Sequence, residues 1–156
     1  GVAFLNFTDK IAFAALPSLD NSFEDKIAQK DARIEIVKQF FNKYRSPLEP
    51  FAVNIIEAAD AYNLDFRLLP AIAMQESNLC KKIPANSYNC WGFGIYGGKV
   101  ERFDNYTQAI NIVSKTLARE YKNKGFESPQ EIVSKYTPSD NGKWVKSVTH
   151  FMEELQ

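Results

Sequence analysis

The stretch Leu68–Ser77, near the middle of the chain, repeats its apolar residues with the spacing of an amphipathic helix. Leu69, Ile72 and Ala73 fall on one stripe, and Glu76 occupies the next position of the i, i+3, i+4, i+7 pattern. Because such a stripe faces the core of a globular protein, we expect the Glu76 carboxyl to emerge at the edge of the core or in a cleft.

The position of Glu76 also has a chemical consequence. It falls in the last turn of the predicted helix, near the negative end of the helix dipole, and partial burial would remove water from its carboxylate. Both effects disfavour the charged form and would raise the pKa, as a general acid requires. The alternative is that Glu76 turns to solvent or accepts hydrogen bonds from the following loop.

The only two cysteines, Cys80 and Cys90, flank the loop that follows Glu76. A disulfide between them would close a short loop and stabilise the fold by about 2–3 kcal/mol. We predict this bond, which implies an oxidising compartment: the periplasm, the cell surface or the exterior. The alternative is two reduced, buried thiols. No metal site is expected, because two cysteines and the distant His150 do not make a ligand set.

Helical spacing recurs along most of the chain. Further apolar stripes run through residues 37–44, 51–62, 110–121 and 144–155, and Ser128–Glu131 has the pattern of a helix start. Between Glu76 and the third stripe, the glycine-rich stretch predicts a short β-hairpin that pairs residues 94–96 with 100–103. The sequence therefore predicts a mainly α fold, with a small β-hairpin lobe facing Glu76 across a cleft.

The order of several short motifs resembles the lysozyme-like superfamily, which includes soluble lytic transglycosylases and bacterial endo-β-N-acetylglucosaminidases that cleave peptidoglycan. The resemblance covers roughly residues 33–155. The segments that carry it are Ala71–Ser77, Trp91–Tyr96, Phe103–Tyr106, Ser134–Pro138 and Lys143–Val148. The chain lacks a glutamine that the transglycosylase pattern usually has. It departs from the glucosaminidases because it has cysteines and because the segment between Glu76 and the glycine-rich motif is shorter.

This resemblance implies a lysozyme-like catalytic domain that cleaves β-1,4 glycosidic bonds, with Glu76 as general acid/base. It also implies that Tyr136 approaches Glu76 or the acetamido group of the substrate, although a core-packing role is equally open. A hydrolase would need a second carboxylate, for which Glu101 and Asp104 are candidates. The residues expected near the sugar are Ser77, Trp91, Phe93, Gly94, Ile95 and Tyr96. Ser77 could instead cap the helix end.

Length and charge narrow the class of protein. The 156 residues suit one domain, which we place at 21–156 after an apolar segment, 1–20, of uncertain role. Nineteen basic residues balance nineteen acidic ones, which argues against a nucleic-acid partner. No run of eighteen apolar residues is present, so no membrane span is predicted. We expect a monomer without a cofactor, whose partner is a peptidoglycan strand.

Two other functions fit the same sequence. The domain could bind glycans or serve as a cell-wall scaffold without catalysis, in which case Glu76 would be replaceable without loss of binding. It could also be a helical adaptor with no affinity for peptidoglycan.

Overall fold

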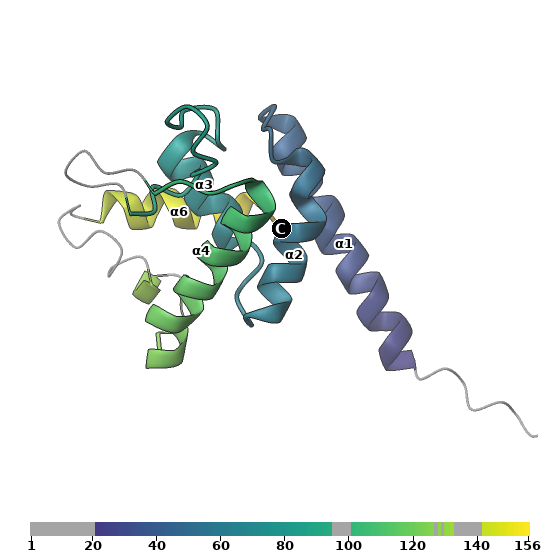
Figure 1. Cartoon of the computed structure of the whole chain (residues 1–156). Coiled ribbons are helices and arrows are strands. Elements are labelled where there is room, and N and C mark those ends of the chain that lie inside the picture. The colour runs from purple at the N-terminus through teal and green to yellow at the C-terminus, as the bar shows by residue number, and fades with distance from the viewer. Residues whose placement is uncertain (1–20, 95–100, 127, 129, 133–141) are drawn as a thin grey trace, which may run out of the picture.

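Helices make up most of the chain where the structure describes it, which is residues 21–94, 101–126, 128, 130–132 and 142–156 of a computed structural model (Figure 1). The elements are α1 (Asn21–Lys43), η1 (Glu49–Phe51), α2 (Ala52–Ala61), α3 (Leu68–Ser77), α4 (Tyr106–Glu120), η2 (Lys122–Lys124) and α6 (Lys143–Glu154). The predicted mainly α class is confirmed.

The predicted β-hairpin is not confirmed. Residues 95–100, which include its turn, lie outside the described residues, and Gly94 and residues 101–103 form no strand. The N-terminal segment 1–20 also lies outside them. None of the helices in the described ranges combines the length and apolar character that a membrane crossing requires.

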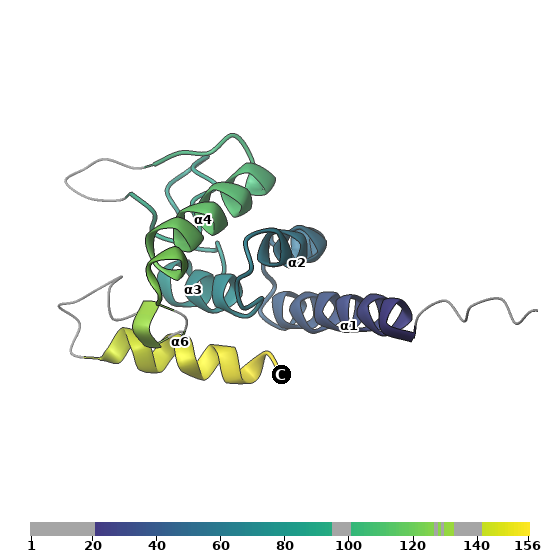
Figure 2. The ribbon, with the colours of Figure 1, turned by 90° about the horizontal axis from the view of Figure 1, so that it is seen from below.

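Helix α3 occupies the centre of the fold, with α6 packed along it in both views (Figures 1 and 2). It begins at Leu68, so Pro70 falls in the first turn, where a missing N–H costs no helical hydrogen bond. Asp65 lies before the helix, and its side chain accepts a 3.0 Å hydrogen bond from the Arg67 N–H. The helix ends at Asn78, which adopts the left-handed conformation at φ +52°.

Helices α1 and α2 pack against one another, and the N-terminal half of α1 projects past the rest of the domain (Figures 1 and 2). The C-terminal half of α1 buries Val37, Phe40 and Phe41, as the apolar spacing predicts. On the surface, Arg33 of α1 donates two hydrogen bonds, of 2.6 and 2.9 Å, to the Asp60 carboxylate of α2. This ion pair links the two helices at the surface, beside their packing contact.

Helix α6 closes the domain by packing its apolar face inward. Trp144, Val148 and Met152 are buried in the core. At its end, the Glu154 carboxylate accepts hydrogen bonds of 2.6 Å from both Lys43 and Tyr44 of the α1 end. Partial burial acts to raise the pKa of Glu154, but the hydrogen bonds from these two partners outweigh it and lower the pKa. The last helix is therefore fastened to the first.

Side chains cap two helix starts, of which the one at Ser128–Glu131 was predicted from the sequence. The Asn105 side chain accepts a 2.8 Å hydrogen bond from the Gln108 N–H at the start of α4. Ser128 and Glu131 form the expected capping box, in which each side chain accepts a hydrogen bond from the other's backbone N–H.

Candidate active site

The carboxyl group of Glu76 lies at the end of the central helix and is partly exposed. The Trp144 indole N–H donates a 2.5 Å hydrogen bond to its Oε1. Trp144 is only 5 % exposed, so the donor of this part-buried contact is largely removed from water. A hydrogen bond is stronger in such an environment than in water. Packing of α6 on α3 therefore holds one oxygen of Glu76 in a fixed direction.

The other oxygen of Glu76 lies against the backbone of Gly92. A β-carbon on residue 92 would lie 2.8 Å from Oε2, closer than van der Waals contact allows. Gly92 also has φ +62°, a conformation that side chains disfavour. Glycine is therefore favoured here for two reasons, its left-handed backbone and the close approach of the Glu76 side chain, which would have to shift for a larger residue.

The same segment reaches a second carboxylate. A β-carbon on Gly94 would lie 3.1 Å from Cβ and 3.7 Å from Oε2 of Glu101. Gly92 thus adjoins Glu76, and Gly94 adjoins Glu101. The structure places both predicted acidic residues beside one three-residue segment.

Ser77 and the disulfide attach this segment to the end of α3. The Ser77 hydroxyl lies 2.7 Å from the Cys90 carbonyl oxygen and accepts a 2.9 Å hydrogen bond from the Cys80 N–H. The predicted Cys80–Cys90 disulfide is confirmed, with the two Cα atoms 4.6 Å apart. Ser77 is buried, so its hydroxyl holds the loop rather than facing a substrate.

The segment from the end of α3 to Cys90 has an unfavourable backbone conformation. Left-handed φ angles are found at Asn78, Leu79, Cys80, Asn86 and Tyr88. Each such residue costs about 1–2 kcal/mol relative to ordinary backbone. The loop therefore needs its cross-links to stay in place.

Replacing both Cys80 and Cys90 by serine is expected to lower the free energy of unfolding by about 2–3 kcal/mol, because the unfolded chain regains the entropy of the open loop. Urea denaturation of wild type and double variant, each with and without reductant, measures this. Reductant should destabilise the wild type and leave the variant unchanged. Identical midpoints for the oxidised and reduced wild type would contradict the prediction.

The aromatic residues predicted to line the sugar subsites separate into different environments. Phe93 is partly exposed and packs on the buried Phe103, with ring centroids 6.3 Å apart. Trp91 is fully buried, and its indole N–H donates to the Leu69 carbonyl oxygen at 3.0 Å. The structure therefore places Trp91 in the core, where it has no face to offer a sugar.

Other predicted site residues cannot be placed beside Glu76. Ile95, Tyr96 and Tyr136 lie outside the described residues. Asp104, the second candidate for a further carboxylate, accepts a 3.0 Å hydrogen bond from the Gln108 side chain at the start of α4. Asp104 therefore takes part in capping that helix.

Sequence reasoning missed two residues of this site, Trp144 as a partner of Glu76 and Asn89. Trp144 was predicted only as part of an apolar face. A buried indole N–H needs an acceptor, and this requirement was the available signal. Asn89 is 1 % exposed, and its side chain bonds to the backbone of Phe93 and Glu101. No local pattern marked it.

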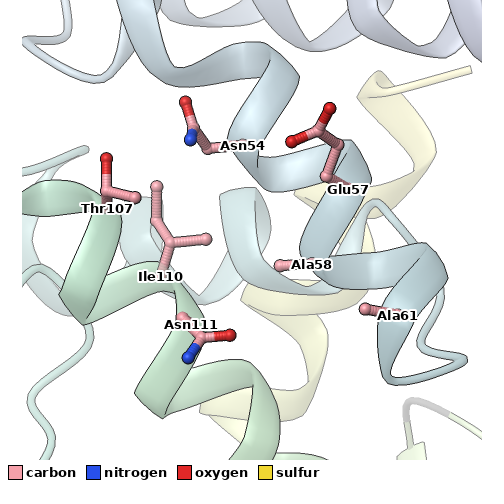
Figure 3. Close-up of a pocket in the computed structure, with 7 residues that line it drawn as sticks. All are labelled: Asn54, Glu57, Ala58, Ala61, Thr107, Ile110 and Asn111. Atoms are coloured by element: carbon pink, nitrogen blue, oxygen red, sulfur yellow. The ribbon is translucent and has the colours of Figure 1, made fainter.

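A separate hollow of about 260 Å³ lies between α2 and α4 (Figure 3). Its lining residues are Asn54, Glu57, Ala58, Ala61, Thr107, Ile110 and Asn111. None of these belongs to the group around Glu76. Within the described ranges, no three His, Cys, Asp or Glu side chains gather closely enough to hold a metal ion.

No protein-family model, curated protein or solved structure matches the chain significantly.

Proposed function

We propose that this domain cleaves β-1,4 glycosidic bonds in peptidoglycan, with Glu76 as general acid/base. The observation that carries the proposal is the partly exposed Glu76 carboxyl, held by the Trp144 indole on one oxygen and adjoining Gly92 on the other. A catalytic proton donor needs this combination of access and fixed orientation. The resemblance of Ala71–Ser77 and Trp91–Tyr96 to lysozyme-like enzymes supports the same conclusion.

The first step is protonation of the leaving glycosidic oxygen. Because Oε1 of Glu76 accepts the indole hydrogen bond, a proton on this carboxyl would be carried by Oε2. That proton passes to the leaving oxygen as the bond to the anomeric carbon breaks, and positive charge develops on the sugar. The resulting Glu76 carboxylate lies close enough to stabilise that charge.

The reaction is completed by one of two routes, according to whether the enzyme is a transglycosylase or a hydrolase. In the transglycosylase route, the muramyl 6-hydroxyl attacks the anomeric carbon and gives its proton to Glu76, which forms a 1,6-anhydro sugar. In the hydrolase route, Glu101 is the second carboxylate. A separation of about 6.5–9.5 Å between the carboxyls would imply inversion and about 5–5.5 Å retention. The disulfide agrees with action outside the cytoplasm, in the periplasm, at the cell surface or beyond it.

Digestion of purified peptidoglycan by the wild type and by Glu76→Gln, with products identified by mass spectrometry, tests the proposal. Anhydro-muramyl ends formed only by the wild type would identify a transglycosylase, and new reducing ends a hydrolase. If neither protein releases products but both sediment with the polymer, the domain is a glycan-binding module. If the wild type also fails to bind the polymer, the result would favour a helical adaptor with no affinity for peptidoglycan.

Replacing Trp144 by phenylalanine is expected to lower kcat about 10-fold or more, because a hydrogen bond to a charged group contributes about 1.5–3 kcal/mol. Phenylalanine keeps most of the apolar surface and removes the N–H. Steady-state kinetics, corrected for the folded fraction, measures the effect.

The matched control is Val148→Ala, which loosens α6 on the same buried face without removing the indole. It should lower stability and leave kcat within about 2-fold, since the Glu76 contact is retained. Equal losses of kcat in both variants would show that Trp144 acts through packing.

A further inference from the structure

The Asn89 side chain joins two backbone segments that adjoin Glu76 and Glu101. Its Oδ1 accepts a 3.0 Å hydrogen bond from the Phe93 N–H, and its Nδ2 donates to the Phe93 carbonyl oxygen at 2.6 Å. The same Nδ2 donates to the Glu101 carbonyl oxygen at 3.1 Å. One buried amide therefore hydrogen-bonds to both the N–H and the carbonyl oxygen of Phe93, and it links this residue to the backbone of Glu101.

Phe93 lies between two glycines, one beside Glu76 and the other beside Glu101. Gly92 precedes Phe93 and lies against Oε2 of Glu76, and Gly94 follows Phe93 and lies against Cβ of Glu101. A shift of Phe93 would therefore alter the surroundings of both acidic residues together.

Asn89 itself is held firmly. Its N–H donates to the Ser87 hydroxyl at 3.2 Å, and the Ser87 carbonyl oxygen accepts a 3.0 Å hydrogen bond from the Phe103 N–H. Asn89 also directly precedes Cys90, which the disulfide links to the end of α3. The amide is therefore fixed both to the helix that carries Glu76 and to the segment that carries Glu101.

We propose that Asn89 is a positioning residue that sets the separation between the carboxyl groups of Glu76 and Glu101. The inference rests on the proposed function in its hydrolase route, where Glu101 is the second carboxylate. Asparagine suits the position because its amide supplies an acceptor and two donors on one rigid plane. Aspartate has the same shape but no donor, so it would face two carbonyl oxygens.

The test compares Asn89→Asp with Ser46→Ala, both measured on soluble peptidoglycan fragments. Ser46 is also buried, and its hydroxyl donates a 2.8 Å hydrogen bond to the Leu79 carbonyl oxygen, while none of its hydrogen bonds within the described residues reaches Phe93 or Glu101. Both variants should lower the unfolding midpoint. Asn89→Asp should lower kcat about 100-fold with KM nearly unchanged, because an error of about 1 Å in position can cost that factor.

Ser46→Ala should keep kcat within about 2-fold of the wild type, as expected for a loss confined to stability. If Asn89→Asp loses no more kcat than Ser46→Ala, the inference is overturned while the proposed function stands. If the wild type itself cleaves nothing, the proposed function fails and the inference falls with it.

A measurement on the wild type keeps the inference open to refutation if Asn89→Asp does not fold. The side-chain amide protons of Asn89 should exchange with solvent at least about 10-fold more slowly than those of the exposed Asn42, since buried hydrogen-bonded groups exchange only on opening. Equal exchange rates for the side-chain amide protons of Asn89 and Asn42 would show that hydrogen bonds do not hold the Asn89 amide, and would overturn the inference.

Discussion

Replacing Glu76 by glutamine is expected to lower kcat for glycan cleavage by about 10³-fold, within the range of about 10²–10⁴ that general acid–base catalysis contributes. Glutamine has nearly the same shape and keeps an oxygen that can accept the Trp144 hydrogen bond, so the fold should be unchanged. It has no proton to give to the leaving oxygen. Single-turnover kinetics on soluble peptidoglycan fragments, with circular dichroism to confirm folding, measures the loss.

The matched control is Glu57→Gln, which makes the same chemical change at an exposed position on α2. Its kcat should equal that of the wild type. A Glu76→Gln variant that keeps more than about one tenth of the wild-type rate would remove Glu76 from the role of acid, because that role contributes at least about 10²-fold.

Replacing Trp91 by alanine is expected to lower the free energy of unfolding by about 3–5 kcal/mol, the range for removing a large aromatic residue from a core. Trp91 is fully buried, so a cavity would remain. The Leu69 carbonyl oxygen would also lose the indole N–H that it accepts. Urea unfolding monitored by circular dichroism measures the loss.

Phe23→Ala is the control, because this aromatic side chain is 57 % exposed on α1 and should change stability by less than about 0.5 kcal/mol. The experiment also separates the two roles of Trp91. A small loss of stability with a large increase in KM would support the sugar subsite predicted from the sequence instead of the core position.

Features that depend on neighbours along the chain were predictable. The helical stripes follow from the 3.6-residue period, and the capping box of Ser128 and Glu131 depends on a spacing of three residues. The disulfide spans ten positions, a loop short enough to close whatever the surrounding fold. The position of Glu76 in the last turn of a helix was predictable because it follows from the apolar period of that segment.

Roles that depend on packing between distant segments were not predictable. Trp91 lies in a glycine-rich, aromatic stretch typical of a binding surface, but the fold turns its side chain into the core. Asn89 resembles any loop asparagine in the sequence, and its importance depends on Glu101 lying twelve residues further on. In both cases one residue type suits several environments, and only the surrounding atoms select among them.

The sequence by itself determined that this chain is mainly helical, that Glu76 ends an apolar helix, and that two cysteines flank the loop behind it. Tertiary structure alone decided what Glu76 contacts. Its partner Trp144 is 68 residues away, and the two meet because α6 packs along α3. Periodicity is a local property that a sequence records directly. A hydrogen bond between remote side chains depends on how whole helices are arranged, which no short stretch of sequence records.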